Sequence, residues 1–349
     1  MSDSKVVVLY NEPDAQAAAG GSWEESDAGV LNAVQAVSEA LNSLGIPCRP
    51  AGVRRLADIG PALQAGSEDT VFNLVERLEG PPTDFNRVPD VCRSLGRACT
   101  GSESHALDLT FDKQLTKRAL RKHGVTVPDA WVCGPGERDL PTPRGAVIVK
   151  PLHADGSEGI GVDSVLTHPD SARLRRAVRR IHDTFGQPAL VERYIEGREL
   201  NVSLFERDGA VSVLPISEID FSLYPAGRPH IVDYAVKWLP GTLPGIVSPR
   251  KVPAPLDTGV AAAVGETAVR AWQACCCNDY VRIDMRMAPD GGLFVLEVNA
   301  NADLSPLAGF PASLRAAGVG FAEFVGAVLA NARRRTRPAV TPDVAASGR

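Results

Sequence analysis

The chain has 349 residues, 44% of them hydrophobic, 23% charged and 5% aromatic, and a formal net charge of −5 from 37 basic and 42 acidic side chains. This composition is ordinary for a globular protein and excludes disorder for most of the chain. The length predicts about two or three domains. No stretch reaches the roughly 20 apolar residues of a membrane-spanning helix, and the mild acidity argues against a nucleic-acid surface. We therefore expect a cytoplasmic protein with neither a membrane nor a nucleic-acid partner.

The seven cysteines form no Cys-x-x-Cys pair, and three of them are consecutive at 275–277. Neighbouring side chains cannot share one small metal site or disulfide without strain, so we interpret the cysteines as reduced packing residues rather than zinc ligands or redox groups. Five arginines lie between residues 173 and 180. We interpret them as the solvated face of a helix.

Hydrophobic periodicity predicts alternating strands and helices over the first hundred residues. Val6–Leu9 and Thr70–Val75 have the composition of buried strands. Between them, apolar residues in steps of three and four predict a helix that Asp27 caps and that ends near residue 45. Another helix is expected to close at Val91–Leu95. This alternation predicts a small open α/β domain.

The elements predicted for the rest of the chain are a helix from a Thr110 cap to Lys122, a buried strand at 146–150, an arginine-rich helix, and strands at 189–192 and 199–205. Residues 221–255 are rich in Pro and Gly without clear periodicity, which is typical of a lid or binding loop. The end of the chain, 333–349, is expected to be a solvated tail.

Two alternating runs, Tyr280–Met287 and Leu293–Asn299, flank Pro-Asp-Gly-Gly and predict a β-hairpin. With the turn at 289–292, Asp284 lies opposite Glu297. Side chains alternate between the faces of a strand, so each face has its own set. One face is predicted to hold Arg282, Asp284, Glu297 and Asn299, and the core face Val281, Ile283, Met285, Phe294, Leu296 and Val298.

Two carboxylates about 5 Å apart repel each other unless a cation lies between them, so the polar face of the hairpin predicts a divalent metal. Two carboxylates and an amide suit Mg²⁺, which completes its shell with water and substrate phosphates. The metal therefore implies a nucleotide. In the alternative that the hairpin leaves open, Arg282 neutralises both acids on a solvated sheet face.

Two lysines favour the nucleotide. Lys150 ends a buried strand and leads into the loop Asp155–Gly161, where a point charge and backbone N–H groups can meet phosphates. Lys113 lies in the first turn of its helix, against the helix dipole, which a nearby anion would explain. The loop is not a Walker motif, because no Gly-Lys-Ser/Thr occurs in the sequence.

The ordered motifs of the chain resemble those of ATP-grasp carboxylate-amine ligases, specifically the D-alanine–D-alanine ligase-like branch, over roughly residues 1–330. These motifs are Asp112-Lys113, Val-Ile-Val-Lys150-Pro, Asp-Gly-Ser157-Glu-Gly-Ile, Val-Glu192-Arg-Tyr-Ile-Glu-Gly-Arg-Glu199, Asp233-Tyr-Ala-Val-Lys237-Trp, Arg282-Ile-Asp284 and Leu-Glu297-Val-Asn299. The resemblance implies an ATP-grasp fold, of class α/β with α+β lobes. It implies a Rossmann-like N-terminal domain at 1–104, two lobes that sandwich ATP at 105–190 and 191–332, and a flexible tail at 333–349.

The resemblance also implies roles for individual residues. Lys113 and Lys150 match phosphate-binding lysines, and Ser157 matches the glycine-rich flap. Glu192 with Tyr194 and Ile195 matches the adenine-reading segment, Glu199 the ribose-binding carboxylate, and Lys237 and Trp238 the mobile loop over ATP. Asp284, Glu297 and Asn299 match the ligands of two Mg²⁺ ions, for which Mn²⁺ can substitute, and Arg282 matches the arginine at the reacting centre. Lys150, Lys237 and Arg282 are the expected catalytic residues.

The substrate segments depart from those of cell-wall D-alanine ligases. Neither the N-terminal Glu-Val-Ser segment nor the Pro-Gly-Met-Thr and His-Ser segment of those enzymes is present; residues 21–27 and 300–309 stand in their places. Glu25 or Asp27 could bind an ammonium group and Ser305 a carboxylate, or each could be a cap or turn residue. Trp238 is a further candidate for the substrate site.

We expect an ATP-dependent ligase that joins amino acids through an acyl phosphate in specialised biosynthesis, with an L-amino-acid or γ-glutamyl dipeptide as product. A D-alanine–D-alanine ligase with altered pockets and a non-catalytic nucleotide-binding protein are the alternatives. The expected partners are small-molecule amino acids, and a homodimer is left open. A nicotinamide dehydrogenase is disfavoured, because the first strand is followed by Tyr-Asn-Glu-Pro and not by a glycine-rich turn.

Overall fold

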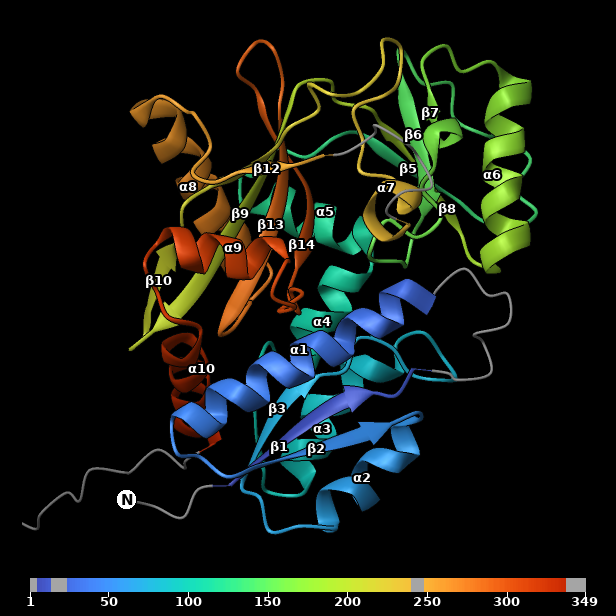
Figure 1. Ribbon diagram of the computed structural model, residues 1–349. Helices are drawn as coiled ribbons and strands as arrows, with labels where there is room; N and C mark the ends of the chain where they lie inside the picture. The colour runs from blue at the N-terminus through green and yellow to red at the C-terminus, as the bar shows by residue number, and fades with distance from the viewer. Residues whose placement is uncertain (1–4, 14–23, 240–247, 337–349) are drawn as a thin grey trace, which may run out of the picture.

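A computed structural model describes residues 5–13, 24–239 and 248–336, which form three sheets with helices packed against them (Figure 1). The side chains of residues 24–28 lie outside this description. The first sheet is parallel, and its strand order is β2 (Cys48–Val53), β1 (Val6–Asn11), β3 (Thr70–Leu74), β4 (Ala98–Cys99). Its helices are α1 (Glu24–Ser43), α2 (Leu56–Gln64) and α3 (Val88–Ser94), and the short helix η2 (Asp84–Arg87) precedes α3.

Strand β1 is buried on both faces, as a parallel strand between two helical layers must be. Val6 and Val8 pack towards α1, and Val7 and Leu9 pack towards α2 and α3. The predicted α/β architecture of this region is therefore confirmed. Asp27 does not cap α1, because the helix begins three residues earlier, at Glu24.

The second sheet is antiparallel and has the order β5 (Ala130–Cys133), β8 (Ala189–Arg193), β6 (Val147–Pro151), β7 (Val165–Leu166). Helix α6 (Ser171–Phe185) buries Leu174, Val178 and Ile181 against it. Four of its five arginines are exposed as predicted, whereas Arg180 is half buried and forms an ion pair with Asp163. The short helix η3 (Val162–Ser164) leads into β7.

The third sheet, also antiparallel, has the order β12 (Arg250–Lys251), β11 (Ser217–Ile219), β9 (Arg198–Arg207), β13 (Tyr280–Met287), β14 (Leu293–Asn299), with β10 (Ala210–Val213) beside β9. The remaining helices are α4 (Ser104–Phe111), α5 (Lys113–Lys122), α7 (Tyr234–Trp238), α8 (Thr258–Ala274), α9 (Gly309–Ala316) and α10 (Phe321–Thr336). Helices α5 and α8 contribute Leu120, Val264 and Ala268 to the core on one face of this sheet.

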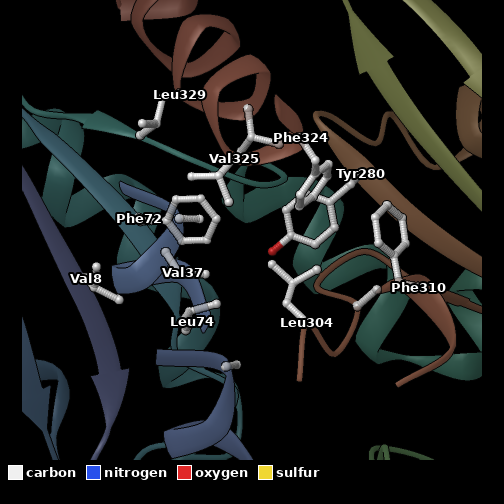
Figure 2. Packing of buried hydrophobic residues seen from close by; sticks show 14 of the residues in the cluster. Val8, Val37, Phe72, Leu74, Tyr280, Leu304, Phe310, Phe324, Val325 and Leu329 are labelled. Atoms are coloured by element: carbon white, nitrogen blue, oxygen red, sulfur yellow. The ribbon is translucent and has the colours of Figure 1, made fainter. Parts of the chain in front are cut away.

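One hydrophobic core joins the first sheet to the third (Figure 2). Val37 of α1 and Phe72 of β3 share it with Tyr280 of β13 and Phe324 of α10. The rings of Tyr280 and Phe324 meet edge to face, with centroids 5.5 Å apart. The N-terminal sheet is thereby fixed beside the hairpin that carries the predicted metal ligands. The domain boundaries given above stay predictions.

Besides the Asp27 cap, three further predicted details were wrong. Thr110 does not cap the helix that follows: its hydroxyl donates to Ala106 O inside α4, and Asp112 breaks the chain into α4 and α5 by adopting an extended conformation and capping α5. Residues 333–336 are not tail but the last turn of α10, where Arg335 forms an ion pair with the buried Asp279. Residues 337–349 lie outside the described chain.

The third wrong detail is the core face of β14. A β-bulge shifts the register after Asp284, so that Met285 pairs with Val295 and Leu296 is the extra residue. Val295 is therefore the buried core residue, whereas Phe294 and Leu296 are only half buried. The opposition of Asp284 and Glu297 on the other side of the bulge is confirmed.

All seven cysteines are free, and four of them are buried, as expected for packing residues. No single helix in the described ranges is long and apolar enough to cross a membrane; α9 and α10 reach that criterion only when they are taken together across a 108° bend.

Candidate active site

Lys150 and Glu192 lie side by side on neighbouring strands of the second sheet. Lys150 pairs with Leu190 in the register, so Glu192, two residues along β8, shares its face of the sheet, and Lys150 Nζ donates to Glu192 Oε1 at 2.9 Å. Both side chains are buried. Burial lowers the pKa of Lys150, but the attraction of Glu192 and then of Glu297 outweighs burial and leaves the pKa raised. Lys150 therefore stays charged.

Lys117 is a third member of this cluster, and sequence reasoning missed it. It lies one helical turn after Lys113 on the face of α5 that also buries Leu120, and its side chain is fully buried. Its Nζ is 2.5 Å from Glu192 Oε2 and donates to Leu296 O at 3.3 Å. Burial lowers the pKa of Lys117 to about 8. The available signal was a lysine at i+4 from Lys113 on an otherwise buried helix face.

Asp284 lies at the centre of a hydrogen-bonded group on the polar face of the hairpin. Arg282 donates to both of its oxygens, at 2.8 and 2.7 Å, and Asn201 of the neighbouring strand β9 donates to Oδ1 at 2.8 Å. The amide of Asn299 donates to Oδ2 at 3.1 Å. The structure thus brings the predicted hairpin residues together and adds Asn201, whose alternation along β9 was the available signal. Arg282 neutralises Asp284, but the cation placed closest to Glu297 is Lys113, at 3.8 Å.

Glu297 lies among four positive charges. Burial alone would raise its pKa, but Lys113, and then Lys150, Arg282 and Lys237, lower the pKa to about 2. Glu297 is therefore ionised at neutral pH. Three of these cations also contact other carboxylates, Arg282 that of Asp284, Lys150 that of Glu192 and Lys113 that of Asp155, so the site holds buried charges of both signs.

Lys113 reaches this group from the first turn of α5. Its Nζ donates to Ala154 O and lies 3.7 Å from Asp155 Oδ1, at the start of the flap, residues 155–161. The side chain is only 5% exposed although it opens a helix, where the dipole disfavours a cation. Lys113 thus lies between the carboxylates of Asp155 and Glu297, which are the nearby anions that the sequence predicted.

The donor set of the hairpin fits Mg²⁺. Asp284, Glu297 and Asn299 offer two carboxylates and an amide, and Mg²⁺ commonly takes one or two protein carboxylates and completes its shell with water and phosphate oxygens. Within the described residues, no three His, Cys, Asp or Glu side chains converge as a self-sufficient metal site. The protein donors are therefore few, as expected for an ion that is shared with a nucleotide.

A cavity of about 110 Å³ lies between the second and third sheets, next to this group. Its walls include the residues predicted for the nucleoside and the flap, Ser157, Glu192, Tyr194, Ile195 and Glu199, and the predicted phosphate-binding Lys150. Arg286, which the sequence did not single out, donates to Glu199 Oε2 at 2.7 Å and lies 5.8 Å from the ring centre of Tyr194. Burial raises the pKa of Glu199, and Arg286 opposes this increase.

The flap and α7 close one side of the site. Ser157 has a left-handed backbone, with φ +65°, and its hydroxyl donates to Val232 O at 2.7 Å. Trp238 Nε1 donates to Gly156 O at 2.8 Å. Lys237 lies 4.8 Å from the Trp238 ring centre, and burial, followed by repulsion from Arg282, lowers its pKa. The predicted loop over ATP therefore contains a short helix that contacts the flap directly.

A second cavity, of about 440 Å³, extends from Arg282 towards the N-terminal sheet. Its walls include Lys237, Trp238 and Asp303. Asp303 Oδ1 accepts from the backbone N–H of Ser305 at 2.7 Å, so Ser305 lies in a turn and Asp303, which the sequence did not single out, faces the cavity. The side chains of Glu25 and Asp27 lie outside the described residues; their backbone is in the first turns of α1.

Buried lysines and carboxylates lie between two antiparallel sheets, and a glycine-rich flap covers them. This arrangement is typical of an ATP-grasp ligase. Residues 139–330 match the family model described as D-ala D-ala ligase C-terminus. A D-alanine–D-alanine ligase of Pseudothermotoga lettingae is 30% identical over 307 residues, which cover 87% of this chain and 94% of that protein. An uncharacterized protein of Sinorhizobium fredii, y4sG, is 32% identical over 271 residues, 78% of this chain and 76% of that protein.

The fold has a solved counterpart. The D-alanine–D-alanine ligase from Bacillus anthracis complexed with ATP superimposes with a TM-score of 0.73 at 19% identity, over 95% of this chain and 98% of that one. The chain belongs to the D-alanine–D-alanine ligase family and is an ATP-dependent, ADP-forming ligase. The family resemblance and the fold class inferred from sequence are thereby confirmed.

Proposed function

We propose that this ligase joins two amino acids by activating a carboxylate as an acyl phosphate, which an amine then attacks. The observation that carries the proposal is the gathering of Lys113, Lys150, Lys237 and Arg282 around Glu297. A carboxylate does not react with an amine directly, because oxide is a very poor leaving group. Transfer of the γ-phosphoryl group of ATP replaces oxide by phosphate, and the cations spread the charge that develops during the transfer.

Each cation has a distinct place in this chemistry. Lys113 and Lys150 bind the ATP phosphates. Lys237, on the short helix α7 that contacts the flap, binds the same phosphates. Arg282, which stands beside the second cavity, stabilises the oxyanion formed when the amine attacks. Asp284, Glu297 and Asn299 would hold two Mg²⁺ ions, or Mn²⁺ in their place, and these ions supply charge neutralisation to the phosphates.

The nucleoside occupies the smaller cavity in this proposal. Glu192 and the backbone of Tyr194 and Ile195 read adenine, and Glu199, oriented by Arg286, binds the ribose hydroxyls. Ser157 and its neighbours cover the phosphates. Because Lys150 and Glu192 are in contact, the adenine-reading carboxylate and a phosphate-binding lysine orient each other.

We infer that the substrates are an L-amino-acid pair or a γ-glutamyl donor with an amine acceptor. The larger cavity, about 440 Å³, supports substrates with side chains larger than that of alanine, because its walls include the carboxylate of Asp303 and the rings of Phe85 and Phe111. Two alanines would leave much of that space unfilled. The names of the relatives favour the second candidate, a D-alanine–D-alanine ligase, since the match to one such enzyme covers 94% of its length.

A screen of amino-acid pairs for ADP release, with mass spectrometry of the products, tests both candidates. The proposal expects ADP and an amide product from at least one L-amino-acid or γ-glutamyl pair in the presence of ATP and Mg²⁺. A D-alanyl-D-alanine product formed in preference to all other pairs would decide for the second candidate. No amide from any pair would refute amino-acid ligation.

A further inference from the structure

One ion pair crosses from the N-terminal lobe to the flap. Arg77 follows β3 in the first sheet, and Glu158 lies in the flap, 81 residues later. Arg77 Nη2 donates to Glu158 Oε1, and both residues line the larger cavity. The Glu158 side chain is 13% exposed and that of Arg77 40% exposed. The pair therefore joins two separate lobes across the cavity proposed to hold the amino acids.

Two further contacts hold the flap from its other side. Trp238 Nε1 donates to Gly156 O, and the backbone N–H of Tyr234 donates to Ile160 O at 3.1 Å, so α7 binds both ends of the flap. The Trp238 ring also approaches α1: a Cβ placed on Gly29 would lie 3.6 Å from it. In Figure 1, α7 lies between the second sheet and the N-terminal end of α1. Among these contacts, Arg77–Glu158 is the one between charged side chains.

We propose that Arg77 is a positioning residue that acts through Glu158 and holds the flap closed on the N-terminal lobe while the acyl phosphate exists. The proposal rests on the proposed function. A flap closed by this pair keeps water from the acyl phosphate, so that the amine attacks its carbonyl carbon, the bond from that carbon to the phosphate oxygen breaks, and phosphate leaves. If the flap opens early, water attacks the same carbon and returns the free carboxylate and phosphate, so that the ADP already formed by phosphoryl transfer is not matched by an amide.

The first test removes each charge separately. Arg77→Met and Glu158→Gln should both raise the ratio of ADP released to amide formed, and should speed the release of a fluorescent ATP analogue about fivefold, the size expected for a partly exposed ion pair. Arg55→Met is the matched control, because Arg55 forms an ion pair with Glu79 at 2.9 Å within the same lobe and neither residue lines the cavity. The control should leave both readouts unchanged.

The second test exchanges the charges. The double variant Arg77→Glu, Glu158→Arg should recover most of the coupling between ADP and amide, because the exchanged pair can still form. No recovery, or unchanged coupling and nucleotide release in the single variants, would overturn the proposal. Rescue also separates positioning from direct substrate binding, since a substrate group would meet the wrong charge in the double variant.

Failure of the proposed function has a different signature. If the wild-type protein forms no amide from any amino-acid pair, the proposal of amino-acid ligation fails. The rate of nucleotide release in the single and exchanged variants still reports whether the ion pair holds the flap.

Discussion

Replacing Lys117 by Met tests the buried charge cluster beneath the nucleotide. Lys117 and Lys150 flank Glu192, with Nζ–Oε distances of 2.5 and 2.9 Å, and all three side chains are at most 7% exposed. Methionine keeps the length and the apolar packing of the lysine stem but removes the ammonium group. Glu192 then has one cationic partner in place of two, while Lys150 keeps its bond.

The expected loss of ATP affinity and the expected change in stability both follow from the contact between Lys117 and Glu192. A hydrogen bond or ion pair to a charged group contributes about 1.5–3 kcal/mol, which predicts a roughly 10- to 150-fold loss of ATP affinity if Lys117 orients Glu192 for adenine. Global stability should change little. Two effects oppose each other: the substitution removes a buried ammonium group whose pKa burial lowers to about 8, and it takes one of two cationic partners from the buried Glu192.

The assay is the dissociation constant of a nonhydrolysable ATP analogue, measured by calorimetry, together with the melting temperature. Lys122→Met, at the exposed end of the same helix, is the control for loss of charge. Unchanged nucleotide affinity, or a fall in melting temperature large enough to account for the lost affinity, would refute the reasoning.

The pH dependence of the wild-type protein provides an independent check on Lys117. Its ammonium loses its proton as pH rises through about 8, so ATP affinity should fall between pH 7 and 9, and Lys117→Met should flatten that dependence. The free energy of unfolding depends on pH with the opposite sign. The folded protein binds fewer protons at this lysine than the unfolded chain between pH 8 and 10.5, so the contribution of Lys117 to the free energy of unfolding rises with pH in that window.

Three further changes follow from the site. Glu297→Gln should abolish ADP formation with an unchanged circular-dichroism spectrum, because an amide is a poor substitute for an anionic ligand of Mg²⁺; normal turnover would exclude Glu297 as a metal ligand. Arg282→Met should lower kcat by about 10²- to 10³-fold, measured as amide formation at saturating ATP, and a smaller effect on amide than on ADP would contradict a role at the oxyanion. Chelation of divalent ions should stop ADP release and added Mg²⁺ should restore it; activity that survives chelation would remove the metal from the mechanism.

Sequence reasoning succeeded where one local rule determined the structure. The alternation of β13 and β14 around a short turn placed Asp284 opposite Glu297, because register in a hairpin is fixed by the turn and by the need to bury one face. It failed at the bulge, since one extra residue moves Val295 into the core and Leu296 out of it. The hydrophobic pattern of β14, which has apolar residues at every position from 293 to 296, does not distinguish the two arrangements.

The residues that sequence reasoning missed are buried polar groups whose partners are distant in the chain. Lys117 meets Glu192 across 75 positions, Asn201 meets Asp284 across 83, and Arg286 meets Glu199 across 87. No local periodicity connects such pairs: Asn201 and Glu199 face Asp284 and Arg286 because β9 and β13 pair in one sheet, and Lys117 meets Glu192 because α5 lies against β8. The N-cap was also assigned to the wrong residue where two candidates lie close together. Asp112, two residues after Thr110, caps α5 by accepting from two backbone N–H groups.

The charges of the site give a reason for these buried charged groups, although burying them costs folding free energy. Lys117 and Lys237 both have lowered pKa values because burial disfavours their charged forms, and Arg282 opposes Lys237 further. The carboxylates of Glu192, Glu297, Asp284 and Asp155 lie against Lys117, Lys150, Lys113 and Arg282 and compensate much of this charge. A protein of net charge −5 has thus concentrated buried charges of both signs at one place, next to the flap. Lysines that burial holds at lowered pKa values cost folding free energy, and the phosphates of ATP would return part of that cost when they bind.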